Sequence, residues 1–196
     1  LSFFAQNLSF GFSYVFAAMA LIIYSQKLKR QMLLGNIMVS ILTAYPYFLL
    51  YFLLFTSQNS QLNLVIYRIF IFLMITSFSL NLIREIIKDL EDINGDFSAN
   101  YKTLPIQLGR NRAHFFAQLL IGMTIAILVS TGLYFFSSYW LVLFFGIGVI
   151  APLIYIAYQI REVNFSNNYY RLSQMLKLIM LVGLLLLVLL PQILKL

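Results

Sequence analysis

Long apolar runs, separated by shorter polar segments, divide this chain from end to end. Each run comes close to the roughly 20 residues that a helix needs to cross the hydrocarbon core of a bilayer. The predicted membrane helices cover residues 8–24, 33–55, 62–87, 113–136, 140–160 and 172–194. Because the apolar runs are continuous rather than alternating, they exclude a membrane β-barrel. The pattern predicts an all-α, multi-pass transmembrane helical bundle of six helices, forming a single domain over residues 1–196.

The polar segments differ in charge. Lys and Arg residues collect after the first, third and fifth apolar runs, whereas the connections after the second and fourth runs contain none. Positively charged loops stay on the cytoplasmic side of a membrane. The three basic loops are therefore expected in the cytoplasm of a bacterial-type inner membrane, with residue 1 outside. An odd number of further helices upstream would explain that placement, so we interpret the chain as the later part of a longer protein.

Composition supports this interpretation and removes other classes. A hydrophobic content of 62% is typical of an integral membrane protein rather than of a soluble domain. The formal charge of +7 is assigned to the cytoplasmic loops and not to nucleic-acid binding. The chain has no cysteine, which excludes disulfides and thiolate metal sites.

Five of the six acidic residues lie together at the end of the third apolar run. They are Glu85, Asp89, Glu91, Asp92 and Asp96. Residues three, four and seven positions apart share one face of a helix. All of these acids except Glu91 are therefore predicted to form one narrow stripe.

The helix that carries the stripe is expected to end at Asn94-Gly95, because Gly tolerates the left-handed cap conformation. Asp96 would then lie in a loop that folds over the stripe. Neighbouring carboxylates repel one another unless a cation holds them, and Mg²⁺ prefers carboxylate oxygens together with substrate phosphates. The stripe indicates either a magnesium–diphosphate site or a solvated helix end with i, i+4 ion pairs.

Basic and aromatic side chains near the stripe are candidates for phosphate binding through charge-assisted hydrogen bonds. These candidates are Lys29, Arg30, Arg84, Lys88 and Lys102. Taken alone, Lys29 and Arg30 are more simply explained as cytoplasmic anchors, and Tyr24 as an interfacial aromatic. His114 is the chain's one histidine, and a structural role is expected for it.

Three segments resemble a known family. The sequence REIIKDLEDINGD (residues 84–96), followed by KTLPIQLG (102–109), closely resembles the second aspartate motif of the UbiA-type intramembrane prenyltransferases. Within that family it is most similar to the geranylgeranylglycerol-phosphate geranylgeranyltransferases. YSQKLKRQMLLGN (24–36) is similar to the family's tyrosine-then-basic segment, and APLIYIAYQI (151–160) to a late helix of its bacterial members.

The resemblance implies a bundle of about nine helices in which two aspartate motifs hold Mg²⁺ against a prenyl diphosphate. The first motif would lie upstream, so residues 1–196 alone are expected to be inactive. By resemblance the metal-binding residues are Asp89, Asp92 and Asp96, and the catalytic residues are Asp92, Asp96 and Lys102. The implied diphosphate-binding residues are Tyr24, Lys29, Arg84, Lys88 and Lys102. Asn100 stands where the family often has Gly, which leaves the path of this loop open.

The implied reaction is Mg²⁺-dependent transfer of a prenyl group, with geranylgeranyl diphosphate as the expected donor. The expected acceptor is geranylgeranylglyceryl phosphate, which would give an ether lipid. An aromatic acceptor, as in quinone synthesis, is the alternative. A membrane transporter is a weaker alternative, since it predicts acids spread along several helices. The DGxxAR pattern of CDP-alcohol phosphotransferases does not occur, because Phe97-Ser98 follows Asp96.

Overall fold

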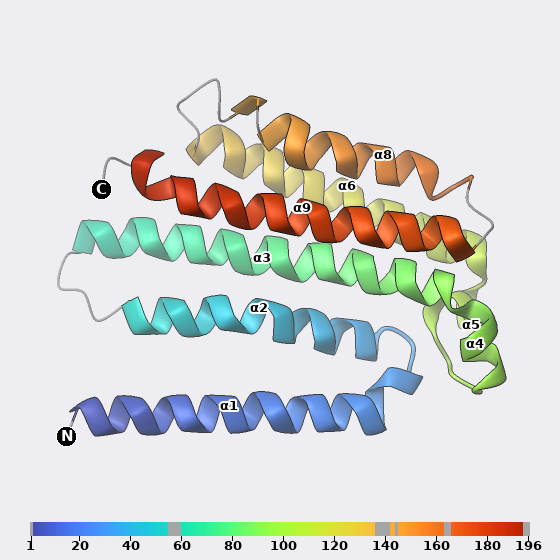
Figure 1. The fold of residues 1–196 in the computed structure, drawn as a ribbon, viewed down its shortest axis with the longest axis horizontal. Coiled ribbons are helices and arrows are strands. Elements are labelled where there is room, and N and C mark those ends of the chain that lie inside the picture. Colours follow the sequence, from blue (N-terminus) through green and yellow to red (C-terminus); the bar gives the residue numbers. More distant parts are fainter. Residues whose placement is uncertain (1, 55–59, 136–141, 144, 163–165, 194–196) are drawn as a thin grey trace.

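The structure, a computed structural model, describes residues 2–54, 60–135, 142–143, 145–162 and 166–193 (Figure 1). These residues are mostly α-helical and contain no strand, which confirms the all-α prediction. The long helices are α1 (Ser2–Gln26), α2 (Leu34–Leu54), α3 (Ser60–Glu91), α6 (Arg110–Phe135) and α9 (Ser166–Ile193). The short elements are η1 (Leu28–Arg30), α4 (Ile93–Ser98), α5 (Leu104–Leu108), the π-helical η2 (Gly146–Ile150) and α8 (Ala151–Gln159).

The long helices lie side by side with their axes roughly aligned (Figure 1). Helix α3 is central, since it packs against α2 on one side and against α6 and α9 on the other. The short elements η1, α4 and α5 gather at one end of the bundle (Figure 1). The basic loops after the first and third predicted spans therefore meet at the same end, as their shared charge indicated.

Three segments of the described residues are long and apolar enough to cross a membrane, namely Leu34–Tyr51, Tyr67–Glu91 and Arg110–Thr131. Two shorter apolar helices cover Gly11–Gln26 and Gly146–Gln159. The predicted fifth span, residues 140–160, begins among residues that fall partly outside the description. Its described part consists of η2 followed by α8, with Pro152 in the first turn of α8.

The core orients α3. Ile83, Ile86, Ile87 and Leu90 follow the i, i+3, i+4, i+7 spacing of one helix face, and all are fully or almost fully buried. They pack in one cluster with residues of α5, α6, α8 and α9. The apolar face of α3 is thereby fixed toward those helices, so the acidic residues of α3 are turned toward a different side.

Candidate functional site

The acidic helix does not end where the sequence analysis expected. Helix α3 stops at Glu91, because Asp92 (φ −94°, ψ 11°) leaves the helical conformation. A separate helix, α4, then runs through Asn94, Gly95 and Asp96. The predictions that Asn94-Gly95 ends the helix and that Asp96 lies in a loop are therefore wrong.

The turn is made five residues later, at Asn100, whose φ is +57°. Asn is one of the few residues that adopt the left-handed conformation readily, because its short polar side chain can bond locally. The amide of Tyr101 closes this turn on the Asp96 carbonyl at 2.9 Å. Asn100 thus performs the conformational role for which Gly is otherwise suited, and this defines the loop path that the sequence left open.

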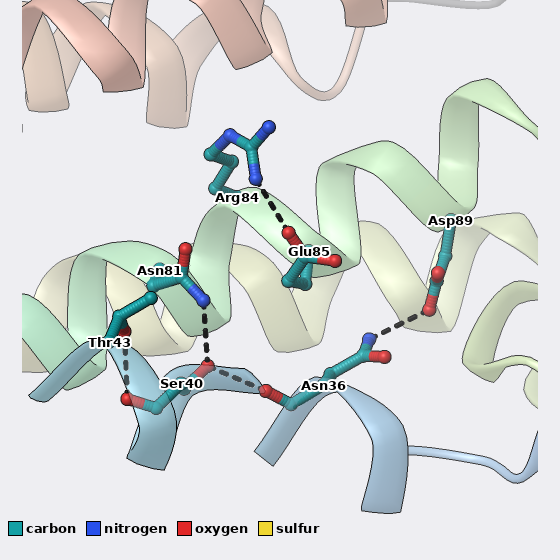
Figure 2. Close-up of polar contacts among 7 residues, drawn as sticks. All are labelled: Asn36, Ser40, Thr43, Asn81, Arg84, Glu85 and Asp89. Carbon is teal, nitrogen blue, oxygen red and sulfur yellow. Dashed lines mark hydrogen bonds and ion pairs between the residues drawn. The ribbon is translucent and has the colours of Figure 1, made fainter. Parts of the chain in front are cut away.

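Asp89 is anchored to the neighbouring helix. Its Oδ2 accepts a hydrogen bond of 2.7 Å from Nδ2 of Asn36, near the start of α2 (Figure 2). It also interacts electrostatically with Asp96, Glu85 and Lys88. The end of α3 and the short helix α4 therefore bring two of the predicted metal-binding carboxylates, those of Asp89 and Asp96, within electrostatic reach of each other.

The pKa of the Asp96 carboxyl is raised above its ordinary value, mainly because partial burial disfavours the charged form. The charge of Asp92 raises it further, whereas Lys29 and Lys88 act in the opposite direction. The Thr103 side chain also lowers this pKa. A carboxylate among other carboxylates is stabilised by a bound cation.

Glu85 forms an ion pair with its neighbour Arg84, with 2.6 Å between Nη1 and Oε1 (Figure 2). Glu85 is buried, so the guanidinium offsets part of the cost of removing its charge from water. Figure 2 shows that the Arg84 side chain extends away from α2, whereas the Asp89 side chain points toward α2. The Nε of Arg84 is buried and has no hydrogen-bond partner among the described residues.

A polar contact between α2 and α3 continues from Asn36 into the bundle. Ser40 Oγ donates to the Asn36 carbonyl at 2.6 Å, and Asn81 Nδ2 approaches the same hydroxyl at 3.4 Å (Figure 2). Thr43 Oγ1 donates to the Ser40 carbonyl at 2.8 Å. These uncharged residues were not among the predicted site residues. Their signal was the i, i+4 spacing of Asn36 and Ser40 in an otherwise apolar helix.

The end of α1 and its connection to α2 bring an aromatic and a basic group to the acidic end. Lys29 lies close enough to Asp96 to interact electrostatically, and Tyr24 lies within the same reach of Glu85 and Asp89. The backbone amide of Lys102 donates to the carbonyl of Arg30 at 3.0 Å. This hydrogen bond joins the loop after α4 to η1.

The side chain of Arg30 supports the same junction, because its Cζ lies 5.9 Å from the centroid of the Tyr101 ring. This is within the range of a cation–π contact. The structure therefore gives Arg30 a contact within the protein.

The predicted site residues are thus brought together to different degrees. Tyr24, Lys29, Lys88, Asp89 and Asp96 converge, whereas Arg84 is engaged by Glu85. The Asp92 and Lys102 side chains are exposed, and Asp92 interacts electrostatically with Asp96. His114 lies on the other side of α3, between α6 and α9, where its Nε2 makes a 2.7 Å hydrogen bond with the Tyr169 hydroxyl, in line with the structural role expected for it.

No group of three carboxylate or imidazole side chains among the described residues is placed to hold a metal ion. Mg²⁺ is usually bound by one or two carboxylates together with substrate phosphates. The Asp89 and Asp96 carboxylates, flanked by Lys29 and Lys88, fit that shared type of site better than a cage built from protein ligands alone.

Comparison with known proteins gives consistent matches. A family model described as the UbiA prenyltransferase family matches residues 1–181. A digeranylgeranylglyceryl phosphate synthase of Methanosphaera stadtmanae is 32% identical over 183 residues, covering 92% of this chain and 62% of that protein. The enzyme of the same name from Saccharolobus solfataricus is 36% identical over 125 residues, or 64% of this chain and 41% of that protein.

A solved structure has a similar fold, with a TM-score of 0.70 and 24% sequence identity. The match covers 89% of this chain and 58% of that one, which is described as "Structural and mechanistic insights into the biosynthesis of Digeranylgeranylglyceryl phosphate synthase in membranes". The chain thus spans less than two thirds of the length of each of these relatives.

Proposed function

Because the chain belongs to the UbiA prenyltransferase family, we propose that the complete protein transfers a prenyl group from a prenyl diphosphate to geranylgeranylglyceryl phosphate. The product is a lipid with a new ether bond. The observation that carries this proposal is the convergence of Asp89 and Asp96 with Lys29 and Lys88 at the end of α3. The names of the curated relatives support the acceptor class.

The residues of this chain bind and orient the donor in this proposal. Asp89 and Asp96 hold Mg²⁺, which as a Lewis acid stabilises the leaving diphosphate. Lys29 and Lys88 contact the diphosphate oxygens and neutralise charge that grows as the bond to the prenyl carbon breaks. The Asn36 amide fixes the Asp89 carboxylate in one orientation, as partners of metal ligands commonly do.

The remaining residues complete the site. Tyr24 contributes a hydroxyl beside Glu85 and Asp89, and Lys102 an exposed ammonium group at the same end. Asp92 lies next to Asp96 and is the third expected metal ligand. We also propose that this end of the bundle faces the cytoplasm, from a bacterial-type inner membrane.

The test uses the complete protein in membranes with labelled geranylgeranyl diphosphate and Mg²⁺. Geranylgeranylglyceryl phosphate and 4-hydroxybenzoate are supplied as competing acceptors. We expect an ether product that is abolished by EDTA and reduced at least a hundredfold in Asp89→Asn and Asp96→Asn. The control is Glu162→Gln, which changes an exposed acid in the connection between α8 and α9. A prenylated aromatic product would instead assign the protein to quinone synthesis, and full activity in EDTA would exclude the magnesium site.

A further inference from the structure

Asn36 and Ser40 of α2 each make a side-chain hydrogen bond to α3 (Figure 2). The first is the 2.7 Å bond from Asn36 to Asp89, and the second reaches Ser40 Oγ from Asn81 Nδ2 at 3.4 Å. Asn81, Glu85 and Asp89 are spaced by four residues, so Asn81 continues the acidic stripe one turn further into the bundle. Ser40 is fully buried and Asn81 almost so. Polar side chains inside a membrane find partners on neighbouring helices, because lipid offers none.

The hydroxyl of Ser40 links the two contacts. It donates its single proton to the Asn36 carbonyl at 2.6 Å, so toward Asn81 it can only accept. An ionised carboxylate also only accepts, which requires the Asn36 amide to present its Nδ2 to Asp89. The donors and acceptors thus connect Asn81 to Asp89 without a conflict at any step.

Contacts at two heights fix the register of a helix pair, because a single contact leaves one helix free to pivot about it. Asn36 and Ser40 are four residues apart, which corresponds to about 6 Å along α2. The Ser40–Asn81 bond therefore holds α2 against α3 one turn away from the point at which Asn36 meets Asp89. A shift of about 1 Å in α2 would carry the Asn36 amide beyond good hydrogen-bond distance of Asp89.

Ser77 makes a comparable contact that lacks this link. Its Oγ donates to the Thr43 carbonyl at 3.3 Å, so it also joins α3 to α2, one turn further from Asp89 than Asn81. Its acceptor is a backbone carbonyl that takes no part in the path to Asp89. The same helix pair thus offers one polar contact that leads to the acidic stripe and one that only holds the helices together.

We propose that Asn81 is a positioning residue for the Mg²⁺–diphosphate site. Through Ser40 it keeps α2 in the register in which Asn36 orients the Asp89 carboxylate. This inference rests on the proposed function, because it takes Asp89 as a ligand of Mg²⁺. It gives a role in the site to an uncharged residue that lies about two turns along α3 from Asp89.

The first measurement is Mg²⁺-dependent binding of labelled geranylgeranyl diphosphate to the complete protein in nanodiscs. Asn81→Leu, which keeps the size of the side chain but removes the amide, should raise the dissociation constant about 3- to 15-fold. Ser40→Ala should have the same effect, because it removes the acceptor of that amide. Ser77→Ala is the matched control and should bind as the natural protein does.

A double variant separates positioning from a general loss of stability. If Asn81 acts through Asn36, Asn81→Leu should add less than about twofold to the dissociation constant of Asn36→Ala, since residues on one hydrogen-bond path are not additive. Losses that multiply would overturn the proposal. So would an Asn81→Leu protein that binds the donor as the natural protein does.

A measurement without Mg²⁺ or donor separates this proposal from the proposed function. The infrared band of the Asp89 carboxylate is identified at alkaline pH by its absence from Asp89→Asn. Its frequency should shift in Asn36→Ala, and Asn81→Leu should reproduce that shift, whereas Ser77→Ala should not. A band at the natural frequency in Asn81→Leu would contradict the positioning role even in a protein that makes the ether product. A natural protein that binds no donor would contradict the proposed function, and the band would still decide the role of Asn81.

Discussion

At the scale of single residues, the site depends on side chains that carry no charge. Asn36 is an example. Its side-chain amide donates a 2.7 Å hydrogen bond to Asp89, and its backbone carbonyl accepts a hydrogen bond from the Ser40 hydroxyl. Sequence reasoning found the charged groups because they are rare in this chain. Asn36 was not predicted as a site residue. An amide side chain becomes important only through its partner on the neighbouring helix, and the packing of the two helices determines that partner.

Asn36→Ala is expected to weaken Mg²⁺-dependent donor binding about 10-fold or more. A hydrogen bond to a charged group contributes about 1.5–3 kcal/mol, and its loss also frees the Asp89 carboxylate to rotate. The measurement is a titration of the complete protein with Mg²⁺ and labelled geranylgeranyl diphosphate.

Thr43→Ala is the control for Asn36→Ala, because Thr43 belongs to the same polar contact but lies away from Asp89. It should leave the titration unchanged. Equal curves for Asn36→Ala and the natural protein would show that Asp89 needs no orienting partner.

At the scale of elements, two contacts decide how helices and connections meet. The first is the close approach of η1 to the start of α2, where Gly35 is buried. A Cβ built at Gly35 would lie 2.8 Å from the Leu28 carbonyl oxygen. The second is the 2.7 Å hydrogen bond between His114 of α6 and Tyr169 of α9, both of which are buried.

Gly35→Ala should displace η1 from α2 and lower the free energy of unfolding by about 1–3 kcal/mol, as overpacking usually does. Because η1 carries Lys29 toward Asp96, activity should fall as well. Thermal unfolding and prenyl transfer are both measured. Gly122→Ala is the matched control, since a Cβ there meets nothing within 4 Å. A Gly35→Ala protein as stable as Gly122→Ala would argue against the close approach.

Tyr169→Phe removes the partner of a buried imidazole and should destabilise the bundle by about 1–3 kcal/mol. The adjacent Tyr170 is exposed, so Tyr170→Phe provides the control and should unfold at the natural temperature. Since His114 and Tyr169 pair between α6 and α9, on the other side of α3 from the Asn36–Asp89 contact, neither change should alter the affinity for Mg²⁺. A selective loss of Mg²⁺ affinity in Tyr169→Phe would mean that His114 acts in the site after all.

At the scale of the whole molecule, the helical architecture was largely predictable. Apolar runs determine where membrane helices lie, and the described parts of all six predicted spans are helical except for the end residues Leu33 and Ile160. The interruption at Asp92 was not predictable, because helical periodicity continues through residues 92–98 and only the chain direction changes. The preference of Gly for the left-handed conformation predicted the helix end at Gly95, whereas Asn100 adopts that conformation in the structure. Which carboxylates converge therefore required the structure.

Orientation in the membrane can be tested with single cysteines, because the natural chain has none. Asn94→Cys at the exposed surface of α4 should react with a membrane-impermeant maleimide in inverted vesicles only. Gln58→Cys, in the uncharged connection between α2 and α3, should react in right-side-out vesicles only. Labelling of both residues from one side would contradict the predicted topology.

The hydrogen bond from the Lys102 amide to the Arg30 carbonyl has a consequence for how this protein can diverge. Both partners are backbone groups, so the contact makes no demand on the side chain at either position, and only proline at residue 102 would remove the donor. Substitutions at residue 102 can therefore change the charge presented to a substrate while the two loops remain attached, whereas substitutions at residue 30 would also remove the cation–π contact with Tyr101. Sequence changes at this junction can therefore alter substrate specificity while the fold is retained.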